Sequence, residues 1–252
     1  MSALHEIRIF PLSGVPEVKA GDDLARIIAD TIRKLGWGLE EGDVLVVAQK
    51  IISKAEGRIV SLDTVQPSAR ASEWAATQEK DARLIEVVLR EAASIVKMER
   101  GLIVARTRHG FVCANAGVDC SNTAAGTATL LPEDPDASAR QLRQRLGKEF
   151  GVNVGVIISD SFGRPWREGL ANVALGVAGV SPLVDYRGMR DGSGNVLQMT
   201  VMARADEVAS AAELVMGKTE RVPVAIIRGI SMQGASGSGR DLIRPADKDL
   251  FK

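Results

Sequence analysis

An almost wholly apolar run at residues 152–159 limits what this chain can fold into more than any other feature. It reads VNVGVIIS and is followed at once by the carboxylate of Asp160. Successive side chains of a strand point to opposite faces of its sheet, so a strand that is apolar at nearly every position has to be covered on both faces. Similar runs at 43–49 and 222–228 predict two further buried strands. Each of these strands therefore needs other elements packed against it.

Amphipathic segments predict the helices that provide this cover. Asp22 begins a predicted helix over 22–35, in which Leu24, Ile28 and Ile32 recur at helical spacing. The other predicted helices span roughly 68–96, 136–150 with Asp136 as cap and Gly151 as stop, and 206–216 with Gly217 as stop. The remaining predicted strands span 7–10, 102–106, 110–114 and 197–203.

These elements follow no strict strand–helix–strand rhythm, so we predict an α+β fold with mixed β-sheets and packed helices. No Gly-x-Gly-x-x-Gly follows a predicted strand, and no Gly-Lys-Ser or Gly-Lys-Thr closes the glycine-rich segment. Both absences argue against a Rossmann or P-loop fold. Residues 1–252 are predicted to form one domain, with a division into two lobes near residue 130 left open.

Composition excludes several classes of function. Lys and Arg together number 32, as do Asp and Glu, and aromatic residues make up 4%, so no nucleic-acid partner is expected. No apolar run approaches the ~20 residues of a membrane span. The N-terminus lacks the basic start and apolar stretch of a signal peptide, so a cytoplasmic location is expected. Two His residues are too few for a His-rich metal site, but an oxygen-ligand site for Mg²⁺ or Mn²⁺ stays open.

Three polar loops, at 115–122, 159–169 and 229–241, each follow a predicted strand. Ligands of open sheets collect where such loops converge. A carboxylate at a rigid strand end, followed by a hydroxyl, is suited to a hard cation, so Asp160 and Ser161 are candidate metal ligands. Asp119 is the natural second carboxylate, although a loop Asp can instead cap a turn.

Basic and glycine-rich residues extend this pattern. Arg164 and Arg167 suit a phosphate or carboxylate ligand, or else form a surface ion-pair network with Glu168. The third loop has the glycines that let backbone amides approach an anion, although a merely flexible loop is the alternative. Lys54 can reach a phosphate or remain a solvated charge. The residues alone thus indicate a metal-dependent enzyme that handles phosphate.

Six long segments, all in order, carry a more specific signal. They run from Pro11 to Phe251 and read PLSGVPEVKAGDDL, VLVVAQKIISKAEGR, NAGVDCSN, ISDSFGRPWREG, VPVAIIRG and LIRPADKDLF. Over nearly its whole length the chain resembles the coenzyme F420-0:L-glutamate ligase family, also called the F420-0 γ-glutamyl ligases, in its stand-alone form.

The resemblance implies a GTP-dependent amide ligase that adds L-glutamate to the lactyl carboxylate of the deazaflavin precursor F420-0, and later glutamates by γ-linkage. It implies an acyl-phosphate intermediate, with GDP and phosphate as products. It also implies two divalent-cation sites for Mg²⁺ or Mn²⁺, with K⁺ as a stimulating ion. Similar proteins form homodimers with an unusual two-lobed mixed fold, so a homodimer is expected here.

The family pattern also assigns roles to single residues. By this resemblance the nucleotide lies against Val15, Pro16, Glu17, Val18, Gln49, Lys54, Asn122, Ser236 and Gly237. The implied metal ligands are Asp119 and Asp160 for the first cation, Ser161 for the second, and Gln233. The residues expected to act in phosphoryl transfer are Asp160, Lys54, Arg164 and Arg167. Gln49 departs from the pattern, which often has Ser there, and guanine preference depends on this position.

Two other interpretations stay open. A metal-dependent nucleotide phosphatase or nucleotidyltransferase would use the same carboxylates without a ligation step. A non-catalytic protein that binds GTP or a deazaflavin would have lost the chemistry, which the intact Asp119 and Asp160 disfavour.

Overall fold

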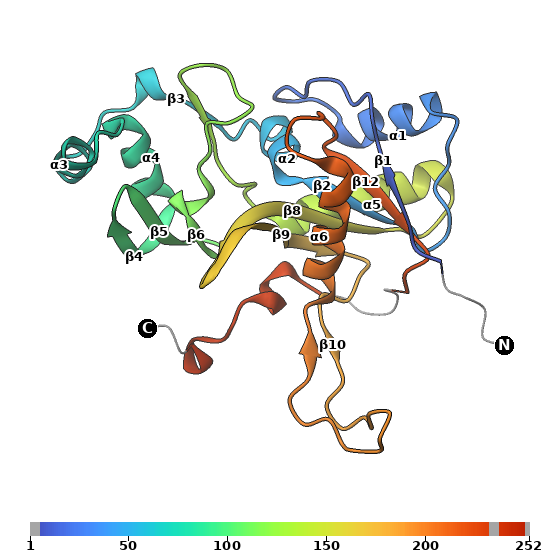
Figure 1. Ribbon diagram of the computed structural model, residues 1–252. Helices are drawn as coiled ribbons and strands as arrows, with labels where there is room; N and C mark the ends of the chain where they lie inside the picture. The colour runs from blue at the N-terminus through green and yellow to red at the C-terminus, as the bar shows by residue number, and fades with distance from the viewer. Residues whose placement is uncertain (1–5, 232–236, 250–252) are drawn as a thin grey trace.

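A five-stranded mixed sheet forms the centre of the computed structural model, which describes residues 6–231 and 237–249 (Figure 1). Its strands, in spatial order, are β1 (Arg8–Pro11), β12 (Val224–Arg228), β2 (Val44–Ala48), β8 (Gly155–Arg164) and β9 (Arg167–Ala178). Strands β2 and β8 run parallel, whereas every other neighbouring pair in the sheet is antiparallel. The fold is therefore α+β with mixed sheets, as the sequence predicts.

Helices cover both faces of this sheet. Leu45 and Val47 of β2 point into a core that they share with α1 (Leu24–Lys34) and α5 (Pro135–Phe150). The alternate residues Val44 and Val46 of β2 point to the other face, where α6 packs. The bounds of α6 are Arg204–Met216. Successive residues of β8 point to opposite faces of the sheet, and Val156, Ile157 and Ile158 are all 0% exposed. The prediction that these apolar strands are buried on both faces is therefore confirmed.

A second group of elements follows strand β2 and helix α2 (Gln49–Ala55) in the chain. It consists of α3 (Ala69–Gln78), α4 (Ala82–Glu91) and the antiparallel strands β4 (Ala92–Glu99), β5 (Leu102–Thr107) and β6 (Val112–Ala114). These elements enclose a separate apolar core that includes Ile85, Val88 and Ile103. Strands β3 (Ile59–Ser61) and β7 (Thr127–Thr129) pair antiparallel between this group and α2.

Short elements complete the described chain. Strands β10 (Val184–Asp185) and β11 (Val201–Met202) form the base of a long hairpin that extends away from the central sheet (Figure 1). The single-turn 3₁₀ helices are η1 (Leu62–Thr64), η2 (Asn115–Gly117), η3 (Gly239–Leu242) and η4 (Ala246–Lys248). In the part of the chain that the structure describes, no helix has the length and apolar character needed to cross a bilayer.

The prediction of one long helix over 68–96 is wrong, because this segment forms two helices, α3 and α4, and the strand β4. Helix α3 ends at Gln78, and its C-cap Glu79 has a left-handed φ of 51°. Asp81 then caps α4 by accepting a hydrogen bond from the N–H of Arg83. Residues 92–99 then form a strand because they pair with β5. Tertiary pairing overrides the local helical pattern here.

The polar segment 159–169 is likewise a β-hairpin and not a loop, because β8 continues to Arg164 and pairs with β9. The predicted strand 197–203 shortens to Val201–Met202. Two predicted helix caps shift by one or two positions, since Asp23 caps α1 and Asp134 caps α5. Asp136 instead accepts hydrogen bonds from the N–H groups of Val177 and Gly239, so it joins α5 to the sheet.

Candidate active site

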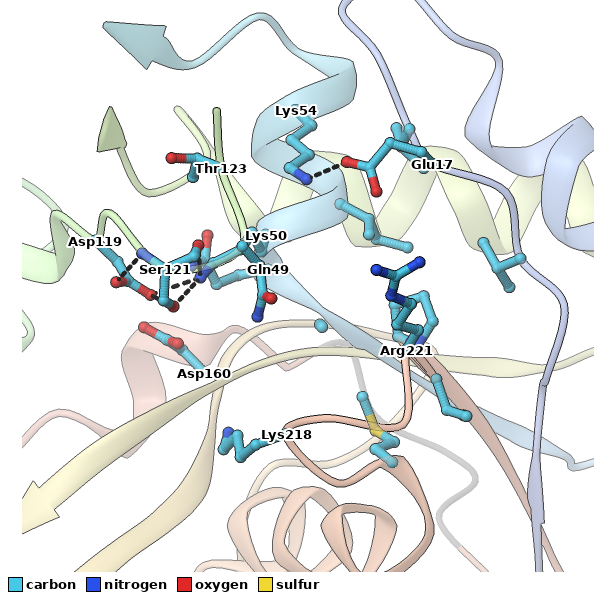
Figure 2. Close-up of a pocket in the computed structure, with 18 of the residues that line it drawn as sticks. Glu17, Gln49, Lys50, Lys54, Asp119, Ser121, Thr123, Asp160, Lys218 and Arg221 are labelled. Carbon is cyan, nitrogen blue, oxygen red and sulfur yellow. Dashed lines mark hydrogen bonds and ion pairs between the residues drawn. The ribbon is translucent and has the colours of Figure 1, made fainter. Parts of the chain in front are cut away.

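A cavity of about 1170 Å³ opens beyond the carboxyl end of β2 and alongside residues 159–161 of β8 (Figure 2). These two strands are parallel neighbours, and Ala48 lies opposite Ser159 in their register. The residues that follow Ala48 and Ser159 therefore lie at the same end of this parallel pair, where ligands of open sheets bind. Helix α2 begins at Gln49 directly after β2, so its first turn forms one wall of the cavity.

Ten of the residues singled out from the sequence line this cavity, although they come from four separate parts of the chain. They are Val15, Pro16, Glu17, Val18, Gln49, Lys54, Asp119, Asn122, Asp160 and Ser161. The fold thus brings both predicted metal carboxylates and most of the predicted nucleotide contacts to one place.

Other predicted site residues do not line the cavity. Arg164 and Arg167 lie at the turn of the β8–β9 hairpin, and the guanidinium of Arg164 donates to the carbonyl oxygens of Glu168 at 2.6 Å and Gly169 at 3.4 Å. Gly237 lies so close to Pro182 that an added Cβ would be 2.1 Å from its Cδ. Gln233 and Ser236 fall outside the described residues, so the predictions for them stay predictions.

Asp119 is held by Lys50, a residue that the sequence alone did not assign to the site. The ammonium of Lys50 donates to Oδ2 of Asp119 at 2.5 Å, and to the carbonyl and hydroxyl oxygens of Ser121 at 2.7 and 2.8 Å. The N–H of Ser121 donates to Oδ1 of Asp119 at 2.8 Å. Partial burial alone would raise the pKa of Asp119, but the hydrogen bonds from Lys50 and Ser121 outweigh it and hold this pKa below its ordinary value.

Asp160 has the opposite character. Burial raises the pKa of Asp160 to about 6, and the negative charge of Asp119 adds to this rise, while the N–H of Ser161 and the cations Lys50 and Lys218 oppose it. The carboxylates of Asp119 and Asp160 lie near each other across the cavity (Figure 2). Of the basic side chains described, Lys50 is hydrogen-bonded to Asp119 and none is hydrogen-bonded to Asp160. The two carboxylates together therefore carry an excess of negative charge.

This excess suits a divalent cation. Mg²⁺ is held in proteins by one or two carboxylates, with water and substrate phosphates completing its shell. Asp119, Asp160 and Ser161 all line the cavity and carry such oxygen donors. Among the residues described, no three or more His, Cys, Asp or Glu side chains are grouped to hold a metal. The donors present, two carboxylates and a hydroxyl, fit a cation whose shell is completed by water and a substrate.

A ring of polar side chains lies behind Ser161, and the sequence analysis missed its other members. The hydroxyl of Ser161 donates to Oδ1 of Asn172 at 2.6 Å, and Nδ2 of Asn172 donates to Oε2 of Glu213 at 2.9 Å. Lys218 closes the ring, since its ammonium donates to the hydroxyl of Ser161 and lies 3.4 Å from Oε1 of Glu213. The ring fixes the Ser161 hydroxyl and places a cation beside it.

A second ion pair lies toward the N-terminal segment. The ammonium of Lys54 donates to Glu17, and the Lys54 residue is only 8% exposed although its carboxylate partner lies in water. Gln49, which is buried, accepts a hydrogen bond from the hydroxyl of Ser53 at 2.8 Å, so its side-chain amide is fixed in the cavity wall. The Oγ of Ser159 is buried in the same wall and has no hydrogen-bond partner among the described residues.

The comparisons with known proteins agree with a site of this kind and identify its class as a ligase. The family model for "F420-0:Gamma-glutamyl ligase" matches residues 14–229, which include every cavity residue named above. The chain belongs to this family.

Curated relatives of the chain carry the name "Coenzyme F420:L-glutamate ligase". The protein of Methanopyrus kandleri is 48% identical over all of both chains. The protein of Methanothermobacter thermautotrophicus is 46% identical over 98% of this chain and 99% of its own length, and that of Methanocaldococcus jannaschii is 44% identical over 94% of each. The similarity therefore extends over the whole cavity and both groups of elements around it.

Proposed function

We propose that this protein is a GTP-dependent amide ligase that joins L-glutamate to the lactyl carboxylate of the deazaflavin precursor F420-0 and then extends the product by γ-linked glutamates. One observation carries this proposal. In a chain of the γ-glutamyl ligase family, Asp119 and Asp160 meet in one cavity together with Lys50, Lys54 and Lys218.

The chemistry explains why the site needs this charge pattern. A carboxylate and an amine do not condense in water without activation of the carboxylate. In the proposed reaction a carboxylate oxygen of the acceptor attacks the γ-phosphorus of GTP, and GDP leaves. The amine of glutamate then attacks the acyl carbon, phosphate leaves, and the amine loses a proton. Phosphoryl transfer of this kind depends mainly on positioning and charge neutralisation.

Different cavity residues are proposed to bind the nucleotide, to hold the cation and to neutralise the phosphoryl group. Lys54 and the segment from Val15 to Val18 are proposed to hold the nucleotide, and Lys50 and Lys218 to offset the charge of the transferring phosphoryl group. Asp119, Asp160 and Ser161 are proposed to hold Mg²⁺ or Mn²⁺, which would neutralise phosphate oxygens. The ring through Asn172 and Glu213 keeps Ser161 and Lys218 in position.

A homodimer is part of the proposal, and the β10–β11 hairpin is the surface that supports it. Apolar side chains of this hairpin are exposed, among them Met189 at 54% and Met199 at 89%. Exposed apolar surface of this kind favours a protein contact. Light scattering coupled to gel filtration measures the oligomeric state, and a monomer would contradict this part of the proposal.

Mass spectrometry of F420-0 after incubation with the protein, GTP, Mn²⁺ and L-glutamate tests the proposed reaction. The expected result is a mass increase of one or more glutamyl residues that depends on all four components. Phosphate release from GTP without F420-0 and glutamate would instead support a nucleotide phosphatase. Nucleotide binding without any turnover would support a non-catalytic binding protein.

A further inference from the structure

Arg221 lies in the cavity wall in an unusual backbone conformation. It belongs to the segment 217–223 that connects α6 to β12, and its φ is 56°. Left-handed backbone is unfavourable for a residue with a long side chain, because its Cβ crowds the following carbonyl. Residues held in such conformations concentrate at binding and catalytic sites.

The surrounding segment shows how this conformation is maintained. The carbonyl of Pro223 accepts a hydrogen bond of 2.8 Å from the N–H of Ala48, so the chain just after Arg221 is tied to β2. On the other side, Glu220 accepts hydrogen bonds of 2.9 Å from both the N–H and the hydroxyl of Thr219. The carboxylate of Glu220 is thus occupied locally.

The charge of Arg221 also stands out from those of its neighbours. Five basic side chains line the cavity, and three of them are paired with carboxylates: Lys50 with Asp119, Lys54 with Glu17, and Lys218 with Glu213. Within the described residues, neither the ammonium of Lys19 nor the guanidinium of Arg221 has a hydrogen bond or ion pair to another side chain.

The direction of the Arg221 side chain completes the observation. Its guanidinium points into the cavity, toward the side where Glu17 and Lys54 lie, and not toward the sheet from which it comes (Figure 2). A guanidinium presents parallel N–H donors that match the two oxygens of a phosphate or carboxylate group. A strained backbone, an unpaired charge and an inward direction therefore occur together at one residue.

We propose that Arg221 is an oxyanion-binding residue of this cavity, which holds a phosphate or carboxylate group of a substrate by a two-point contact. The inference rests on the proposed function in taking the cavity as the substrate site. A nucleotide phosphate and the carboxylate of glutamate share the required chemistry, and the experiment below separates them. The strained backbone is retained because it directs the guanidinium into the cavity.

Replacement by glycine tests the proposal, since glycine adopts φ near +56° without strain. Arg221→Gly is expected to keep or raise the melting temperature while it weakens binding of an anionic ligand by at least about tenfold. Arg100→Gly is the matched control, because Arg100 has a φ of 51°, is exposed and lies in the turn between β4 and β5, outside the cavity. It is expected to leave all binding unchanged.

Three probes identify the ligand. Calorimetry with GDP and with inorganic pyrophosphate reports phosphate binding, and the KM for L-glutamate reports carboxylate binding. A loss confined to GDP and pyrophosphate assigns Arg221 to the nucleotide, and a loss confined to glutamate assigns it to the amino acid. Pyrophosphate binding needs no ligation, so a loss there supports the site even if the proposed reaction fails. Unchanged binding of GDP and of pyrophosphate overturns the proposal if glutamate is not ligated, and where it is ligated an unchanged KM for glutamate is needed as well.

Arg221→Lys separates the contribution of the parallel guanidinium donors from that of the positive charge. This variant keeps one positive charge but loses the parallel donors, so it is expected to bind more weakly than the wild type and more tightly than Arg221→Gly. A melting temperature that falls in Arg221→Gly, together with unchanged ligand binding, would show that the side chain serves the fold alone.

Discussion

The ammonium of Lys50 lies 2.5 Å from the carboxylate of Asp119, a residue 69 positions further along the chain. This pair joins the first turn of α2 to the loop after η2, and it places a protein cation on a carboxylate that is proposed to bind a metal. A divalent cation bound there would therefore compete with Lys50 for the same carboxylate. Among the described residues, no basic side chain forms a hydrogen bond or ion pair with the neighbouring Asp160, so these residues leave the pair of carboxylates with an excess negative charge even when Lys50 is in place.

The first prediction follows from this competition. Lys50→Met removes the charge and retains the apolar stem, so Mn²⁺ is expected to bind about three- to tenfold more tightly than to the wild type, or ~0.7–1.4 kcal/mol. Titration calorimetry measures this affinity without any turnover. Lys97→Met, at an exposed pair with Glu99 outside the cavity, is the control and is expected to change nothing. Weaker binding to Lys50→Met would contradict the competition.

The second prediction concerns pH and stability. Burial raises the pKa of Asp160 to about 6, so the folded protein binds this proton more tightly than the unfolded chain does. The free energy of unfolding therefore falls as pH rises from about 4 to 6, and the loss is complete above that range. In Asp160→Asn the side chain is uncharged at every pH, so no buried negative charge forms as the pH rises. Without divalent cations it is expected to exceed the wild type in stability by ~1–3 kcal/mol at pH 8, and to match it near pH 4.

Urea unfolding in the presence of a chelator, repeated between about pH 4 and 8, checks this prediction. Asp185→Asn is the control, because hydrogen bonds from Arg187 lower the pKa of the exposed Asp185 to about 2. Its carboxyl is ionised in both states over most of this range, so its effect on stability is expected to stay nearly constant. A constant difference for Asp160→Asn as well would show that Asp160 is not protonated near pH 6.

The sequence predicts the centre of the fold well, because the signal there is local. The apolar runs that contain Val46, Ile157 and Ile226 identify three buried strands, and polar residues directly after two of them identify the edge where the cavity opens. Asp160 is in the cavity because it follows Ser159, the residue of β8 that lies level with the end of β2. Asp119 reaches the cavity through long-range contacts, since its backbone pairs with Thr129 and its carboxylate accepts a hydrogen bond from Lys50. These contacts cannot be inferred from local sequence.

Strand β4 shows why other parts could not be predicted. Its register shifts between Ala92 and Ser94 and again between Ile95 and Lys97, so its inward-facing side chains recur at every third position. Such bulges give a strand the spacing of a helix face. The hairpin of β8 and β9 was missed for a related reason, since its polar, glycine-containing turn region resembles a loop and its pairing is set by contacts across the sheet.

The residues behind Ser161 were missed because each is ordinary by itself. Asn172, Glu213 and Lys218 come from β9, α6 and the segment after α6, and none stands in a recognisable motif. Only the packing of α6 against the sheet brings them into one hydrogen-bonded ring. A buried Asn at 5% exposure is the one signal, and burial is not visible in a single sequence.

The third prediction tests the nucleotide end of the cavity. Lys54→Met keeps the buried stem but removes the ammonium, and GDP binding is expected to weaken about 10- to 100-fold, since hydrogen bonds to charged groups contribute ~1.5–3 kcal/mol. The variant is expected to remain folded because its partner Glu17 is exposed and is solvated when released. Calorimetry measures the affinity and thermal unfolding checks the fold. An unchanged GDP affinity would place the nucleotide elsewhere.

The last prediction compares two basic residues, Lys218 and Arg167, whose placement reverses the expectation from the sequence. Lys218 is in the cavity beside Ser161, whereas Arg167 lies at the hairpin turn, although only Arg167 was predicted to act in phosphoryl transfer. Lys218→Met is expected to lower kcat about 100-fold with a smaller change in the KM for GTP, because a cation that offsets transition-state charge acts mainly on turnover. Arg167→Met is expected to keep kcat within about twofold. Equal losses in both variants would mean that the hairpin turn reaches the reacting groups, for instance from a second copy of the chain, and mixing the two inactive variants would then restore activity.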